Sequence, residues 1–277
     1  MLVDYQAEYD NRRRVPEYEA ISRRWAERSR GYRETATVEL GLPYGRGERH
    51  RFDLYRCGVV NAPLVVYLHG GYWQWGDRAL YGFLAESLNA AEIDVAIPSY
   101  PLCPAATVLE IIRDIRGCLV AIWRFTAVRP LVVGHSAGGQ LAASMLASDW
   151  SRILGAPDDF VLSAVAVSGV FDLEPLIETT INDALNLDSR TARMASPRNW
   201  PVPVGRRLLA VVGAEESSEF RRQARDIVDV LGGAGVRTDF LEVEAANHFT
   251  VVDELARIGS QLNLRVIDLA CDLNMAG

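Results

Sequence analysis

The sequence contains no lysine, so arginine supplies all 29 of its basic residues. This excludes chemistry that needs a lysine amine, such as Schiff-base catalysis, a P-loop, or a serine enzyme with a lysine base. Positive charge is also scarce overall, because the formal net charge is −7. An acidic chain argues against a nucleic-acid or anionic-membrane partner. The run Arg12–Arg14 is too short to reverse that balance, and we expect it to be a solvated helix face.

Cysteine is sparse, and its four positions show no C-x-x-C spacing. They are Cys57, Cys103, Cys118 and Cys271. Scattered cysteines favour free thiols in a reducing compartment over a disulfide framework. The first twenty residues lack the apolar core of a signal peptide, and no apolar run reaches the roughly 18 residues that indicate a membrane span. We therefore expect a cytoplasmic protein with no membrane partner.

The chain does contain a regular alternation of strand and helix patterns. Amphipathic patterns over 4–33 predict one or two helices, and residues 35–42 and 50–57 predict a hairpin. Six further strands are expected at 63–70, 94–100, 129–136, 162–171, 206–215 and 237–248. Helical patterns separate them, and a last helix is expected from about 250 to 270. This indicates an α/β fold, a mostly parallel central sheet with helices on both faces and an antiparallel hairpin at one edge.

One segment interrupts the alternation. Residues 172–201 lie between two strands and resemble short helices joined by turns. We expect a small helical cap above the carboxyl ends of the strands, where open α/β sheets bind ligands. At 277 residues and 49% hydrophobic, the chain is predicted to form one domain spanning 1–277.

A G-x-S-x-G motif, Gly-His-Ser-Ala-Gly at 134–138, follows a predicted strand and opens a predicted helix. In that context a sharp turn presents the serine hydroxyl above the sheet, and the glycines allow close backbone approach. We therefore predict Ser136 as a nucleophile. A serine hydroxyl is a poor nucleophile unless a base takes its proton.

Four histidines are available as that base. His50 is expected at the surface, while His69 and His135 are expected to hold loop geometry. His248 follows the last strand, where the chain order serine, acid, histidine of α/β-hydrolases places the base. The histidines show no metal-ligand spacing, so neither a metal nor an organic cofactor is predicted.

The third catalytic group should be a carboxylate in the turn after the strand at 206–215. Glu215 and Glu216 both lie there, whereas Glu219 is expected in the following helix. The residues alone leave Glu215 and Glu216 open.

Backbone amides are needed to stabilise the oxyanion of an acyl-transfer reaction. We predict that Gly70, Gly71 and Ala137 supply them, because His-Gly-Gly follows one strand and Ala137 follows the serine. Tyr72 and Trp73 then fall beside the reacting carbonyl and are predicted to line an aromatic substrate pocket. Trp75 is equally consistent with the pocket and with packing of the next helix.

With His-Gly-Gly-Tyr-Trp at 69–73, Gly-His-Ser-Ala-Gly-Gly at 134–139 and Asn-His-Phe at 247–249, the sequence resembles the kynurenine formamidase (arylformamidase) group of α/β-hydrolases. The resemblance covers nearly the whole chain and implies the α/β-hydrolase fold. It matches Ser136 and His248 to the family nucleophile and histidine. It also favours Glu216 as the acid, where eukaryotic members have aspartate.

The resemblance implies a serine hydrolase that cleaves a small aromatic N-formyl amide such as N-formylkynurenine. It equally implies esterase activity on small aryl esters, so a carboxylesterase or an amidase of secondary metabolism is the alternative. A ligand-binding homologue that has lost catalysis is a remote third. The expected partner is a small aromatic amide or ester, and dimers are common enough in α/β-hydrolases to leave a homodimer open.

Overall fold

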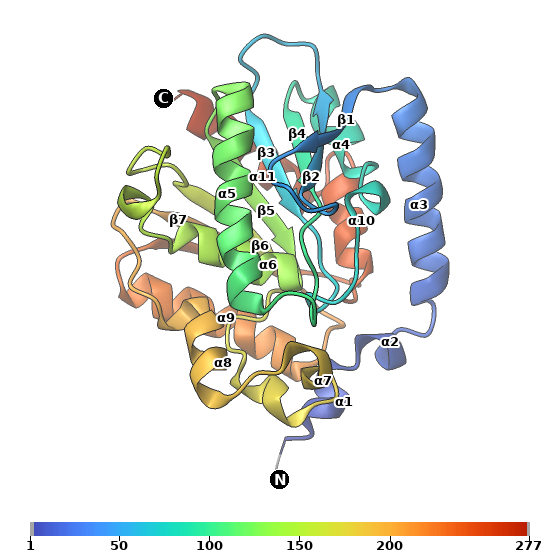
Figure 1. The fold of residues 1–277 in the computed structure, drawn as a ribbon. Coiled ribbons are helices and arrows are strands. Elements are labelled where there is room, and N and C mark those ends of the chain that lie inside the picture. The colour runs from blue at the N-terminus through green and yellow to red at the C-terminus, as the bar shows by residue number, and fades with distance from the viewer. Residues whose placement is uncertain (1–2, 276–277) are drawn as a thin grey trace.

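The computed structural model describes residues 3–275, and within them eight strands form one sheet (Figure 1). The strands are β1 (Thr37–Pro43), β2 (Arg51–Arg56), β3 (Leu64–Leu68), β4 (Asp94–Pro98), β5 (Pro130–His135), β6 (Ser163–Val167), β7 (Arg207–Gly213) and β8 (Arg237–Val243). Their order is β1-β2-β4-β3-β5-β6-β7-β8. Only the β1–β2 and β2–β4 pairs are antiparallel. The predicted parallel sheet with a hairpin at one edge is therefore confirmed.

The parallel strands are apolar along their whole length because both faces of the sheet are covered. All five residues of β3 are buried. Leu64, Val66 and Leu68 pack into the core on one face. Val65 and Tyr67 pack into the core on the other.

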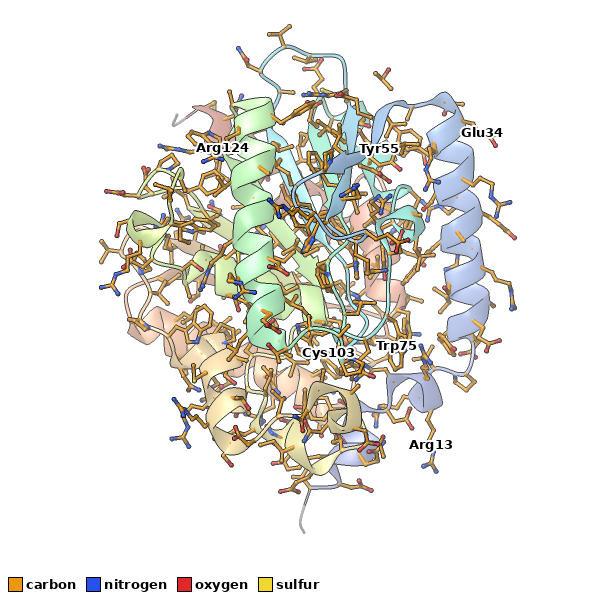
Figure 2. The ribbon with its side chains drawn as sticks, in the orientation of Figure 1. Arg13, Glu34, Tyr55, Trp75, Cys103 and Arg124 are labelled. Carbon is orange, nitrogen blue, oxygen red and sulfur yellow. The ribbon has the colours of Figure 1, made fainter. Side chains whose placement is uncertain are left out.

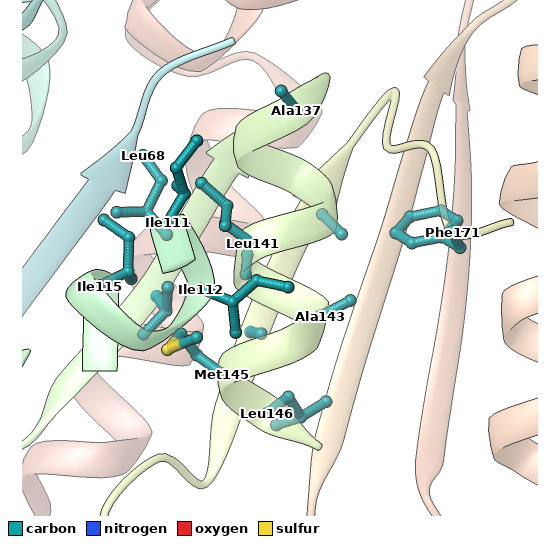
Figure 3. Packing of buried hydrophobic residues seen from close by; sticks show 14 of the residues in the cluster. Leu68, Ile111, Ile112, Ile115, Ala137, Leu141, Ala143, Met145, Leu146 and Phe171 are labelled. Carbon is teal, nitrogen blue, oxygen red and sulfur yellow. The ribbon is translucent and has the colours of Figure 1, made fainter. Parts of the chain in front are cut away.

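Helices form a layer on each face of the sheet. One layer holds α5 (Val108–Thr126), α6 (Ala137–Leu146) and α9 (Ser218–Gly233). The other holds α3 (Tyr18–Thr35), α4 (Leu84–Ala90), α10 (Thr250–Ala256) and α11 (Gln261–Met275). Figure 3 shows Ile111 and Ile112 of α5 packed near Leu141 of α6.

Two helical regions differ in detail from the sequence prediction. The single helix expected from 250 to 270 is two helices, α10 and α11, separated at Gly259, where φ is +79°. The N-terminal region holds three helices in place of one or two, because α1 (Tyr5–Tyr9) and α2 (Asn11–Arg14) precede α3. Asp10 separates the first two: its side chain accepts a hydrogen bond from the amide of Arg13 and caps α2.

Residues 172–201 form η3 (Glu174–Glu178), α7 (Asn182–Leu185), α8 (Ser189–Ala195) and η4 (Pro197–Asn199). These short helices lie at the same end of the molecule as α1 (Figure 1). The amide of Thr180 donates to Oε1 of Gln6 at 2.8 Å, which ties the insertion to the N-terminal helices. A membrane-crossing helix needs a long apolar stretch, and no helix within residues 3–275 has one.

Candidate active site

Ser136 lies at the bend between β5 and α6, with φ +57° and ψ −119°. A left-handed backbone is costly for a residue other than glycine and persists only where the surroundings enforce it. Here the packing enforces it, because a Cβ at Gly134 would collide with the carbonyl oxygen of Gly138. A Cβ at Gly138 would collide with the carbonyl oxygen of Leu68. The two motif glycines are therefore required by backbone contact.

His248 and Glu216 form a buried hydrogen-bonded pair. Nδ1 of His248 lies 2.7 Å from Oε2 of Glu216, and the side chains are 5% and 0% exposed. A carboxylate can only accept, so Nδ1 carries the proton and Nε2 is left as an acceptor. Glu215, the alternative that the residues alone left open, is exposed and makes no such contact within residues 3–275.

Glu216 is held from its other oxygen by two further donors. Oε1 accepts from the hydroxyl of Ser168 at 2.5 Å and from the amide of Gly213 at 2.7 Å. Ser168 is buried directly after β6 and has φ +51°. Ser168 is not among the site residues predicted from the sequence. The available signal was a serine at the carboxyl end of an apolar strand, the edge where the other candidate residues meet.

The two loop histidines are buried and hold backbone. Nε2 of His135 donates to the carbonyl of His248 at 2.7 Å, and burial lowers the pKa of His135 well below its usual value. Nδ1 of His69 donates to the carbonyl of Gly70 at 2.8 Å, and burial lowers its pKa to about 4. Both rings are therefore neutral near pH 7, as donors to carbonyl groups should be.

The predicted oxyanion residues lie close to the serine. A Cβ at Gly70 would stand 2.9 Å from the Cβ of Ser136, so the glycine backbone packs directly against the candidate nucleophile. Gly71 has φ +117°, which favours glycine. Ala137 is the first residue of α6, and the first amides of a helix have no partner within it.

The rings after Gly71 separate into three different positions. Tyr72 lines the cavity beside Ser136, and its hydroxyl donates to the carbonyl of Tyr9 at 2.6 Å. Trp75 also lines the cavity and is 45% exposed at its mouth (labelled in Figure 2). Trp73 corrects the sequence prediction: it is completely buried in the core and is absent from the cavity lining. Left-handed backbone at residues 72 and 73 turns its ring inward, where Nε1 donates to Gln140.

A cavity of about 430 Å³ joins these groups. Gly70, Gly71, Ser136 and His248 line its floor. The N-terminal segment supplies a second part of the lining. We call it the N-terminal wall and define it as Gln6, Tyr9, Asp10, Asn11, Arg12, Tyr18, Ser22 and Trp25. No pattern in the sequence predicts a site role for this segment.

Arg12, Arg13 and Arg14 are all exposed on α2, as the sequence predicts, and Arg12 makes an additional contact with the cavity. The guanidinium of Arg12 lies 4.1 Å from the ring centre of Trp75 and 4.8 Å from that of Tyr18. Only the recurrence of aromatic residues among charged ones in the N-terminal segment could have indicated such stacking.

Comparison with known proteins identifies the family and the fold. A family model described as alpha/beta hydrolase fold matches residues 65–252. Kynurenine formamidase of Salmo salar is 32% identical over 83% of this chain and 80% of its own. The Danio rerio kynurenine formamidase is 30% identical over the same shares. A crystal structure of a proposed thioesterase from Silicibacter superposes with a TM-score of 0.88 at 29% identity, covering 96% of this chain and 100% of that one.

The fold and the family match define an enzyme of the α/β-hydrolase type. Within that class, the identity and coverage of the two fish relatives show that the chain belongs to the kynurenine formamidase family.

Proposed function

We propose that this enzyme hydrolyses a small aromatic N-formyl amide of the N-formylkynurenine type through an acyl-enzyme on Ser136. The observation that carries the proposal is the buried His248–Glu216 pair, whose histidine lines the same cavity as Ser136. The names of the two fish relatives support the formamide as the substrate class.

In the first half-reaction, Oγ of Ser136 attacks the formyl carbon while its proton passes to Nε2 of His248. Glu216 keeps Nδ1 protonated and stabilises the imidazolium that forms. The amides of Gly70, Gly71 and Ala137 stabilise the oxyanion. The C–N bond then breaks, and the imidazolium gives its proton to the departing aromatic amine.

In the second half-reaction, His248 takes a proton from water as the water oxygen attacks the formyl ester. The bond from carbon to Oγ breaks, and the proton returns to Ser136. Formate leaves, and the enzyme is restored without a cofactor.

The direct test measures kcat/KM for N-formylkynurenine by release of formate and of the free amine. Ser136→Ala should lower kcat about 10⁵- to 10⁶-fold, by analogy with serine removal in other serine hydrolases. Ser151→Ala, at an exposed serine outside the cavity lining, is the control and should stay within roughly threefold. If the wild-type enzyme cleaves N-formylkynurenine no faster than the background reaction, the proposed formamidase function is wrong.

An esterase function is the second candidate, because the Silicibacter neighbour is a proposed thioesterase at 29% identity. The same groups would cleave an aryl ester by the same two half-reactions. Comparing kcat/KM for N-formylkynurenine with that for p-nitrophenyl acetate separates the two. A preference for the ester of more than about 100-fold would favour the esterase.

We also propose that the enzyme works in the cytoplasm. Support comes from the four cysteines, which are free thiols, with Cys103 and Cys118 buried. Immunodetection in cell fractions tests this, and recovery in a secreted fraction would overturn it.

A further inference from the structure

Arg12 is an unpaired cation at the mouth of the cavity. No Asp or Glu lies within ion-pair distance of its guanidinium among residues 3–275. By contrast, Arg24 and Arg28 of α3 both pair with Asp253. The positive charge of Arg12 is therefore not compensated by a carboxylate, and it lies in the lining of the candidate active site.

Two aromatic rings hold Arg12 in place without neutralising it. Its guanidinium stacks on Trp75 and Tyr18, and all three residues line the cavity. Stacking on the face of a guanidinium leaves its N–H groups free at the edge. An arginine fixed in this way loses little conformational entropy when an anion binds.

A row of adjacent aromatic rings connects Arg12 to the candidate base. The ring centres of Tyr18 and Phe249 are 5.8 Å apart, and those of Phe249 and His248 are 5.5 Å apart. Phe249 and His248 line the cavity as well. A planar substrate can therefore lie along this row of rings, with its scissile carbonyl at Ser136 and a further group directed to Arg12.

We propose that Arg12 binds a carboxylate on the aromatic part of the substrate. The preferred substrate class is then an aryl formamide, or aryl ester, whose ring carries an acidic side chain. A guanidinium matches a carboxylate with two parallel hydrogen bonds, which a neutral substrate cannot form. Asp10 is the one carboxylate of the described lining, and its Oδ1 accepts from the amide of Arg13. The choice of a formamide rests on the proposed function, whereas the role of Arg12 does not.

The test compares an acidic with a neutral substrate in matched variants. Arg12→Met keeps apolar contact with both rings but removes the charge. It should raise KM for N-formylkynurenine about 10- to 100-fold, leave kcat within roughly twofold, and leave KM for formanilide unchanged. Arg12→Lys should restore part of the lost affinity. Arg13→Met is the control and should change neither KM, because Arg13 points away from the molecule in Figure 2.

A second substrate pair separates this proposal from the proposed function. O-acetyl-L-tyrosine is an aryl ester with a carboxylate, and p-tolyl acetate is its neutral counterpart. If neither formamide is cleaved but Arg12→Met selectively weakens O-acetyl-L-tyrosine, the formamidase assignment fails and the carboxylate site stands. Equal KM changes for acidic and neutral substrates, or no change in either, would overturn the carboxylate site. Thermal unfolding of each variant shows whether it is folded. If Arg12→Met is misfolded, the KM values of Arg12→Lys for the acidic and neutral substrates decide between these outcomes.

Discussion

The two sides of the cavity are held by different kinds of contact. On the floor, Ser136 is positioned by backbone packed against backbone at Gly134 and Gly138, and Glu216 by three hydrogen bonds. On the N-terminal wall, side chains make the links. The hydroxyl of Tyr72 donates to the carbonyl of Tyr9, and that of Tyr9 donates to Glu219 at 3.0 Å.

We infer from this difference that the reaction depends mainly on the floor and substrate selectivity mainly on the N-terminal wall. A change on the floor must disturb a close-packed backbone or a buried ionic group, both of which are costly. A change on the wall removes one side-chain contact from an otherwise intact structure. Substitutions on the floor should therefore lower kcat or stability, and substitutions on the wall should mainly change KM.

The largest effect is expected from Glu216→Gln. A neutral amide cannot stabilise the imidazolium of His248, so kcat should fall about 10³- to 10⁴-fold with little change in KM. Glu215→Gln is the matched control, because this neighbour is exposed. Steady-state kinetics on both variants measures the contrast. If kcat falls equally in Glu216→Gln and Glu215→Gln, the contact between Glu216 and His248 does not control the rate.

The next effect is on stability. Gly134→Ala should lower the free energy of unfolding by about 3 kcal/mol or more, because its Cβ would collide with the carbonyl of Gly138. Gly31→Ala in α3 meets no atom within 4 Å and should raise it by roughly 0.5 kcal/mol. Denaturant unfolding gives both values. A stable Gly134→Ala protein would contradict the packing argument.

Acid should destabilise the protein through the buried histidine that precedes Gly70 of the floor. The folded pKa of His69, about 4, lies below its unfolded value near 6.5, so both states are neutral above pH 6.5. Below pH 6.5 the unfolded state binds a proton that the folded state does not, and stability falls until about pH 4. The expected loss from His69 is about 2 kcal/mol at pH 5.

His69→Asn isolates that contribution, because the asparagine amide can still donate to the carbonyl of Gly70. Denaturant unfolding at pH 7 and pH 5 should show a smaller loss in the variant than in the wild type. The remaining loss includes His135, whose pKa is also lowered by burial. An identical loss in both proteins would exclude His69 as a source of acid sensitivity.

A smaller effect is expected from Ser168→Ala, which removes one of the donors to Glu216. The carboxylate keeps the amide of Gly213, so kcat should fall only about 10-fold while KM is unchanged. Ser163→Ala, at the opposite end of β6, is the control and should leave kcat unchanged. An unchanged kcat in Ser168→Ala would mean that Gly213 alone positions the acid.

The smallest effect is expected at Tyr72, which is hydrogen-bonded to the N-terminal wall. Tyr72→Phe removes the hydroxyl that joins Tyr9 and Asn11, and should raise KM roughly 2- to 10-fold with kcat unchanged. Tyr67→Phe is the matched control, because its buried hydroxyl has no hydrogen-bond partner in the described structure. A fall in kcat for Tyr72→Phe would show that wall and floor are coupled.

Local pattern was sufficient for the parts of the molecule that repeat a simple rule. The alternation of apolar strands and amphipathic helices predicted the sheet and its hairpin. The Gly-His-Ser-Ala-Gly motif predicted the bend at Ser136, because close backbone approach requires glycine at 134 and 138. The position of His248 after the last strand followed from the chain order of such enzymes.

Long-range contacts were not predictable in the same way. Trp73 and Trp75 are two residues apart, yet one is in the core and the other is at the cavity mouth, because left-handed backbone breaks the simple alternation. Ser168 carries no motif of its own. The residues of the N-terminal wall lie far from the floor residues in the sequence, and only the tertiary fold brings the two groups to one cavity.

By itself, the amino-acid sequence determined the class of fold, the bend at Ser136 and the histidine that follows β8, since each depends on local geometry and chain order. Only the tertiary structure decided that Glu216 contacts His248 while Glu215 is exposed, and that Arg12 stacks on Trp75. The physical reason is that burial and pairing depend on which distant segments share one space, and no local pattern specifies that.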